Sequence, residues 1–119
     1  NLVRAALDGV AAGLAYAVSC LRAAGIPGNR IVLVGGGSRH IAWQQAIADA
    51  TGLPVEVRGG REHAARGAAT QIAAILRNQP VAELVEAWRP PVLATNSPRP
   101  EMRERFRLDE RLALAGQSA

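Results

Sequence analysis

The residues best able to do chemistry in this sequence form one short stretch, Gly35-Gly36-Gly37-Ser38, which directly follows the β-branched run 31–34. Glycines at the carboxyl end of a strand let the backbone approach a ligand with no Cβ in the way. Free N–H groups at the start of a following helix attract anions or polar ligand atoms. The pattern is typical of nucleotide-binding α/β proteins. A tight strand-to-helix turn without a ligand is the alternative interpretation.

Several other chemistries are excluded by residues that the chain lacks. All 14 basic residues are arginines, so no lysine is present for a Walker-A phosphate loop or a Schiff base. The single Cys20 cannot form an internal disulfide or a cysteine zinc site, and we expect it to be a small buried residue in a cytoplasmic protein. His40 replaces the third glycine of the dinucleotide fingerprint, which argues against an oxidoreductase. We assign no metal ligand.

The elements that must position the glycines follow from hydrophobic periodicity. Apolar residues recur at spacings of three and four in segments that predict helices over 2–24, 38–51, 62–77, 81–88 and 101–115. Short β-branched runs at 31–34 and 55–57 predict strands, and the first should be buried on both faces. Four prolines between residues 90 and 100 predict an irregular segment.

This alternation of helix and strand predicts an α/β fold. Two strands cannot make a self-sufficient sheet, so further strands should come from sequence upstream or from another copy.

A few side chains have predicted local roles. Ser38 is a suitable N-cap for the helix after the glycines, and Glu62 would place a carboxylate in the first turn of the next helix. The small residues Gly67-Ala68-Ala69 would pack closely against another element. Trp43 is interpreted as a core anchor, and Asp49 as a local hydrogen-bonding residue rather than a catalyst.

Composition narrows the class of protein. The chain has 119 residues, 49% of them hydrophobic and 20% charged, which fits one compact domain or a piece of a larger one. Its net charge of +4 comes from arginines interleaved with acids, so we expect no nucleic-acid partner. No uninterrupted apolar run approaches the roughly 18 residues of a membrane span, so we expect no membrane partner. The missing initiator Met suggests a fragment.

Several motifs in fixed order resemble the C-terminal part of the FGGY carbohydrate kinases. They are Leu33-Val34-Gly35-Gly36-Gly37-Ser38-Arg39, Trp43-Gln44-Gln45, Ala48-Asp49, Gly52-Leu53-Pro54-Val55, Glu62 and Gly67-Ala68-Ala69. The similarity covers residues 2–77. It implies part of an actin-like, ribonuclease-H-like ATPase domain, with residues 1–78 as its core and 79–119 as a helical tail with a proline-rich segment.

The resemblance also implies how this segment would bind ATP. Gly36 and Gly37 would lie against the ribose and phosphate end of the nucleotide, Ser38 would supply a backbone contact, and Ile41 would face the adenine. In this family Mg²⁺ is bound mainly by the part of the protein outside the matched segment, and the sugar substrate binds through the N-terminal domain. The catalytic Asp also lies outside the matched segment. No catalytic role is therefore transferred to Asp8, Asp49 or Asp109.

The expected function is a segment of an ATP-dependent sugar kinase, inactive when isolated, in the branch of the family that converts D-xylulose to D-xylulose 5-phosphate. Two alternatives stay open. One is a family member acting on glycerol, gluconate or another pentulose. The other is a non-catalytic oligomerisation module, whose long first helix and alanine-rich faces pair with a second copy to form a homo-oligomer.

Overall fold

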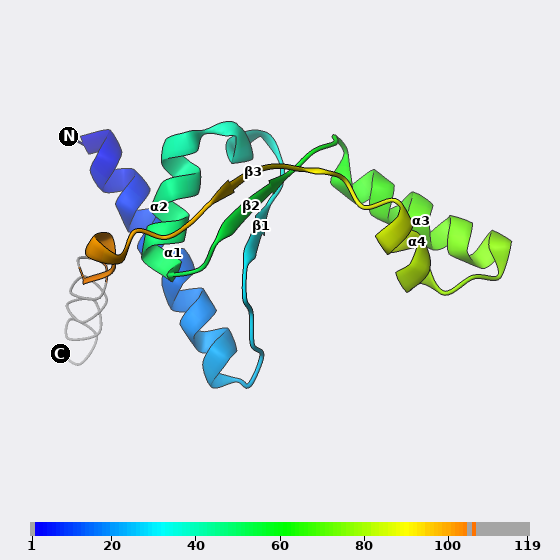
Figure 1. Cartoon of the computed structure of the whole chain (residues 1–119), viewed down its shortest axis with the longest axis horizontal. Coiled ribbons are helices and arrows are strands. Elements are labelled where there is room, and N and C mark those ends of the chain that lie inside the picture. The colour runs from blue at the N-terminus through cyan, green and yellow to red at the C-terminus, as the bar shows by residue number, and fades with distance from the viewer. Residues whose placement is uncertain (1, 105, 107–119) are drawn as a thin grey trace.

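The computed structural model describes residues 2–104 and 106, and Figure 1 shows the arrangement of its elements. In chain order these are α1 (Leu2–Ala23), β1 (Ile31–Leu33), a 3-10 turn (Gly36–Arg39), α2 (Ile41–Thr51), β2 (Val55–Arg58), α3 (His63–Arg77), α4 (Val81–Ala87) and β3 (Val92–Asn96). Residues 100–104 and 106 are also helical. The rest of the predicted last helix lies outside the described residues.

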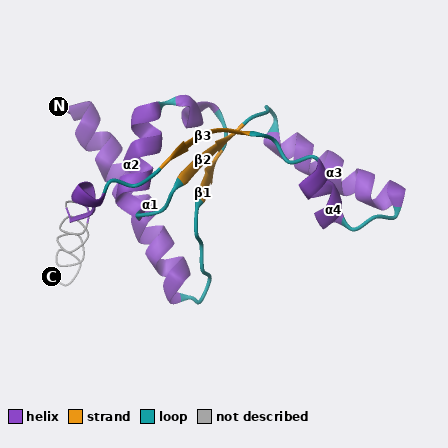
Figure 2. Cartoon of the chain, viewed as in Figure 1, coloured by secondary structure: helices purple, strands orange, loops and turns teal. Residues whose placement is uncertain are grey.

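The sheet has the strand order β1-β2-β3 (Figure 2). β1 runs parallel to β2, with Ile31 opposite Val55, whereas β3 runs antiparallel to β2, with Asn96 opposite Val55. The prediction of an irregular segment between the prolines is therefore wrong. Pro91 and Pro98 flank β3 rather than interrupt it, and a strand tolerates proline at its ends. The third strand, β3, comes from this chain itself and lies beyond residue 78. The predicted division into two parts at residue 78 stays a prediction.

Helix α2 lies between α1 and the sheet. On the α1 side, Ala11 and Ala46 are buried together with Phe106. On the sheet side, Ile47 and Ala48 pack against Val55 of β2. Because most of these side chains are small, the helices approach closely, and short-range packing replaces the bulk that aromatic residues would supply.

Only one face of the sheet is covered by described residues. Ile31 and Leu33 point toward α2 and are partly buried, whereas Val32 is 44% exposed. The prediction that this strand is buried on both faces is therefore wrong for the described chain. The physical reason is that α1 and α2 lie on the same side, so alternate side chains of β1 meet no second layer.

Helices α3 and α4 form a hairpin that extends away from the sheet and makes the molecule 55 Å long (Figure 1). Arg66 donates to the Trp88 carbonyl at 2.8 Å, and the Arg77 guanidinium lies 5.5 Å from the centroid of the Trp88 ring. Gly67 has open space around its missing side chain, so the predicted close packing of residues 67–69 is wrong within the described chain. Glu62 precedes α3 as its N-cap, with φ 52°, instead of lying in the first turn.

The outer face of α1 is largely exposed. Cys20 lies on it, so the prediction of a buried cysteine is wrong. A hydrogen bond to Cys20 is the main cause that raises the pKa of Tyr16, one helical turn away.

By length and composition alone, α1 is the described helix that could cross a membrane. The core helix of a soluble protein and a signal sequence meet the same criteria, and α1 packs along α2 by one face while 11% of its apolar span is buried.

A first prediction concerns the end of α2. Gly52 has φ 67°, and a Cβ added there would lie 2.9 Å from Arg103 Nε. We expect Gly52→Ala to lower the free energy of unfolding by about 1–2 kcal/mol because the alanine would hold a strained left-handed backbone, whereas the exposed Arg103 side chain can move away from the added Cβ. Gly67→Ala on the open face of α3 is the matched control and should raise stability by up to about 1 kcal/mol. Thermal denaturation checks both, and equal effects would contradict the prediction.

Candidate functional site: a glycine turn at the carboxyl end of β1

The predicted glycine stretch forms a tight turn that Ser38 closes. Gly35 has φ 88°, a backbone conformation that L side chains rarely adopt. The Ser38 hydroxyl donates to the Gly35 carbonyl at 2.6 Å, and the Ser38 N–H donates to the same oxygen at 3.2 Å. The predicted N-cap role of Ser38 is therefore wrong. A 3-10 turn intervenes, and His40 is the N-cap residue of α2.

The turn leaves its main chain uncovered. A Cβ added at Gly35, Gly36 or Gly37 would meet no heavy atom within 4 Å outside its chain neighbours. A second turn, Gly59-Gly60, follows β2, and since β1 and β2 are parallel, both turns lie at the same edge of the sheet. Together they line a cavity of about 510 Å³. Carboxyl ends of parallel strands are where α/β proteins bind ligands.

Most of the charged side chains that line this cavity are arginines. Arg39, Arg58, Arg61 and His63 face it, together with the acid Glu62. Arg58 already binds Glu56 Oε2 at 2.7 Å and the Pro90 carbonyl at 3.1 Å, so its charge is used within the fold.

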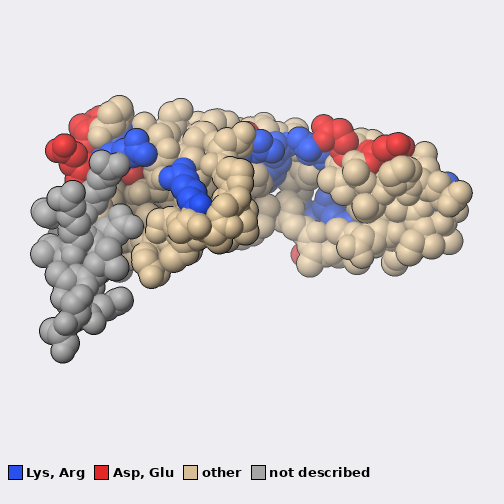
Figure 3. All heavy atoms as spheres, turned by 90° about the horizontal axis from the view of Figure 1, so that it is seen from below, with Lys and Arg blue, Asp and Glu red and all other residues tan. Residues whose placement is uncertain are grey.

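Arg39 and Arg61 are exposed, and neither has an ion pair or side-chain hydrogen bond to another described residue. Figure 3 shows basic side chains gathered in the narrow middle part of the molecule, between the sheet and the α3–α4 hairpin. The free guanidinium groups suit an anionic ligand.

The four predicted site residues do not share one cavity. Gly36 and Ser38 line the basic cavity. Gly37 instead lines a neighbouring apolar hollow of about 500 Å³, between the first turns of α1 and α2, which Trp43 also lines. Ile41 is 74% exposed and lines neither. The ligand contacts predicted for these residues stay predictions.

The second glycine turn and Arg61 are the site features that the sequence analysis missed. The signal was present, because Gly59-Gly60 follows a strand and precedes a helix just as Gly35-Gly36-Gly37 does. The sequence pattern alone does not show that β1 and β2 are neighbours in the sheet. It is their pairing that brings the two turns together.

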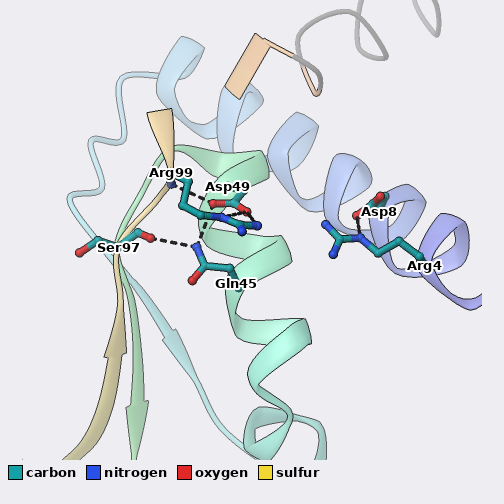
Figure 4. A network of polar contacts seen from close by, with 6 residues as sticks. All are labelled: Arg4, Asp8, Gln45, Asp49, Ser97 and Arg99. Carbon is teal, nitrogen blue, oxygen red and sulfur yellow. Dashed lines mark hydrogen bonds and ion pairs between the residues drawn. The ribbon is translucent and has the colours of Figure 1, made fainter. Parts of the chain in front are cut away.

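A buried polar network lies near the carboxyl end of α2 (Figure 4). The Asp49 carboxylate is fully buried and accepts hydrogen bonds from Arg99 Nη2 at 2.6 Å, from the Arg99 main-chain N–H at 2.9 Å and from Gln45 Nε2 at 2.9 Å. Burial alone would raise the pKa of Asp49, but the hydrogen bonds from Arg99 and Gln45 outweigh it and hold the pKa below its ordinary value. The prediction that Asp49 is a hydrogen-bonding residue is confirmed, but its main partner, Arg99, lies 50 residues further along the chain rather than close in sequence.

The other acids near the core do not form a reactive centre. Asp8 accepts from Arg4 Nε at 2.9 Å, one turn along α1 (Figure 4). Asp109 lies outside the described residues. Within residues 2–104 and 106, no group of three or more His, Cys, Asp or Glu side chains could hold a metal ion.

Comparison with known proteins identifies the class. The model of the FGGY family of carbohydrate kinases, C-terminal domain, matches residues 1–75, so the chain belongs to the FGGY family. Its relatives include the xylulose kinase of Streptomyces coelicolor, 38% identical over 89 residues, and that of Escherichia coli, 35% identical over 86 residues. These matches cover 74% and 72% of this chain but 18% of each relative.

A solved structure supports the fold. The crystal structure of xylulose kinase from Rhodospirillum rubrum matches with a TM-score of 0.70 and 21% sequence identity, over 93% of this chain and 23% of that chain. The predicted α/β architecture of a partial actin-like ATPase domain is therefore confirmed.

Proposed function

We propose that this chain is the C-terminal-domain segment of a xylulose kinase, which transfers the γ-phosphoryl group of ATP to D-xylulose and forms D-xylulose 5-phosphate. Two observations support the proposal. The FGGY relatives compared above are both named xylulose kinase. The observation that carries the site assignment is the cavity where the bare Gly36 main chain meets two arginines without described partners.

The residues present fit a nucleotide. Gly36 has no side chain to exclude a ribose or phosphate from the backbone. Arg39 and Arg61 can neutralise phosphate oxygens, and guanidinium groups bind phosphate through paired hydrogen bonds. As the family resemblance implies, Gly37 would then lie with Gly36 against the ribose and phosphate end, and Ile41 would face the adenine.

The segment would bind and orient ATP without performing the proton transfer. Asp8 and Asp49, the aspartates of the described chain, are both held by arginines and lie outside the cavity. We propose that the catalytic base, the ligands of Mg²⁺ and the sugar site belong to the remainder of the kinase. This division of roles agrees with the prediction that the isolated segment is inactive.

Turnover by the full-length protein tests the proposal. A coupled assay of ADP release should show ATP consumption that requires a sugar, with kcat/KM at least about tenfold higher for D-xylulose than for glycerol or gluconate, a difference of about 1.4 kcal/mol. A preference for glycerol or gluconate would favour the alternative substrate within the same family. No turnover with any sugar or polyol would contradict the kinase assignment.

The second candidate, an oligomerisation module, is favoured by the apolar surface of α3 and α4. Ile75 and Leu76 are 79% and 81% exposed. Sedimentation of the full-length protein at low micromolar concentration discriminates, because a monomer would contradict self-association. The cytoplasmic location and the lack of nucleic-acid and membrane partners stay predictions.

A further inference from the structure

We propose that Gln44, held by Asn96, is a positioning residue that fixes the glycine turn for nucleotide binding, so that the ATP site depends on strand β3. The effect on ATP rests on the proposed function. The effect on the turn itself does not.

The contacts form a short relay through the protein. Gln44 is only 4% exposed, and its Nε2 donates to the Ser38 carbonyl at 2.6 Å. Its Oε1 accepts from Asn96 Nδ2 at 2.6 Å. These hydrogen bonds therefore connect the end of the glycine turn, through the Gln44 side chain on α2, to Asn96 at the end of β3. Asn96 lies 52 residues after Gln44 in the sequence.

The chemistry of the three groups permits one arrangement. A main-chain carbonyl can only accept, so the amide nitrogen of Gln44 must face Ser38. The amide oxygen of Gln44 is then left to face Asn96, which must present its own nitrogen. Each buried polar group is satisfied in this orientation, and reversing either amide would set two like groups against each other.

The turn needs this support because it has little of its own. Gly35, Gly36 and Gly37 contribute no side chain, and glycine has the greatest backbone freedom of any residue. The hydrogen bonds from Ser38 to Gly35 and from His40 to Gly37 remain within residues 35–40. Gln44 instead connects the turn to the buried side of α2 and to the sheet.

The chain offers a matched control in the next residue. Gln45 Nε2 donates to the Ser97 carbonyl at 3.0 Å and to Asp49 Oδ1 at 2.9 Å. It therefore also ties α2 to the chain around β3, but neither of these bonds reaches the glycine turn. Gln44→Met and Gln45→Met remove the same amide from side chains of similar length, so the difference between them reports the hydrogen bonds that Gln44 makes with Ser38 and Asn96.

Steady-state kinetics of the full-length protein give the first readout. We expect Gln44→Met to raise KM for ATP roughly three- to tenfold, the range for loss of one buried hydrogen bond. KM for D-xylulose should stay within about twofold. Gln45→Met should leave the ratio of the two KM values unchanged. Asn96→Asp, which cannot donate to Gln44 when ionised, should act in the same direction as Gln44→Met and serves if that variant folds poorly.

Amide hydrogen exchange in the nucleotide-free full-length protein gives a readout that needs no kinase activity. Gln44→Met and Asn96→Asp should each speed exchange at residues 36–39 at least about fivefold relative to Gln45→Met, because the turn opens more often. Equal exchange in all three variants would overturn the proposal. If exchange changes as expected but the wild-type protein does not use ATP, the kinase assignment fails and the positioning role stands.

Discussion

Gly36→Leu in the full-length protein is expected to raise KM for ATP at least about thirtyfold, or to abolish measurable turnover, with little change in melting temperature. The structural tolerance follows from the backbone at Gly36, where φ is not in the left-handed region and an added Cβ meets nothing within 4 Å. The functional loss follows from the place of Gly36 in the lining of the basic cavity. A leucine there would occupy the space that the ribose or phosphate needs, and displacing a ligand from its contact surface removes several favourable interactions at once.

Gly28→Leu is the control for this prediction. Gly28 also has open space around its missing side chain and no left-handed φ, but it lies in the loop between α1 and β1 and does not line the cavity. We expect its KM for ATP and its melting temperature to match the wild type. If Gly36→Leu binds ATP normally, or if both variants lose activity equally, the cavity is not the nucleotide site.

The elements that sequence could predict are those whose signal is local. Helix α1 and helix α2 carry apolar residues on one face over several turns, and β1 and β2 are short β-branched runs between glycines. Strand β3 was missed because its identity comes from pairing with β2, in which Ala94 lies opposite Val57. The flanking prolines marked the ends of a strand, and their density alone suggested an irregular segment.

The same distinction separates the predicted from the unpredicted parts of the site. The glycine turn was predictable because three consecutive glycines follow a strand. The cavity was not, because it forms only when the chain after β2 lies beside the chain after β1. Gln44 carries no local signal either, since its function in the fold depends on Asn96.

Asp49 supplies the prediction with the largest effect on stability. Asp49→Ala is expected to lower the free energy of unfolding by about 3 kcal/mol, because it removes a fully buried carboxylate and unpairs the main-chain and side-chain donors of Arg99. The loss also frees the segment after β3 from α2. Glu86→Ala is the control, because Glu86 pairs with Arg89 on the surface and should change stability by less than about 0.5 kcal/mol. Urea denaturation of both variants measures the difference.

The pH dependence of this effect has a defined sign. The pKa of Asp49 is lowered in the folded protein, because hydrogen bonds from Arg99 and Gln45 outweigh the effect of burial. In the unfolded chain this carboxyl regains its ordinary pKa of 3.8, so the unfolded state takes up the proton first as the pH falls. The stabilisation from Asp49 is therefore complete above that value and is lost as the pH falls below it. We expect the stability difference between wild type and Asp49→Asn to be constant from pH 7 to about pH 5 and to shrink toward pH 3. A difference that stays constant down to pH 3 would show that the ion pair with Arg99 does not hold the carboxylate in its charged form.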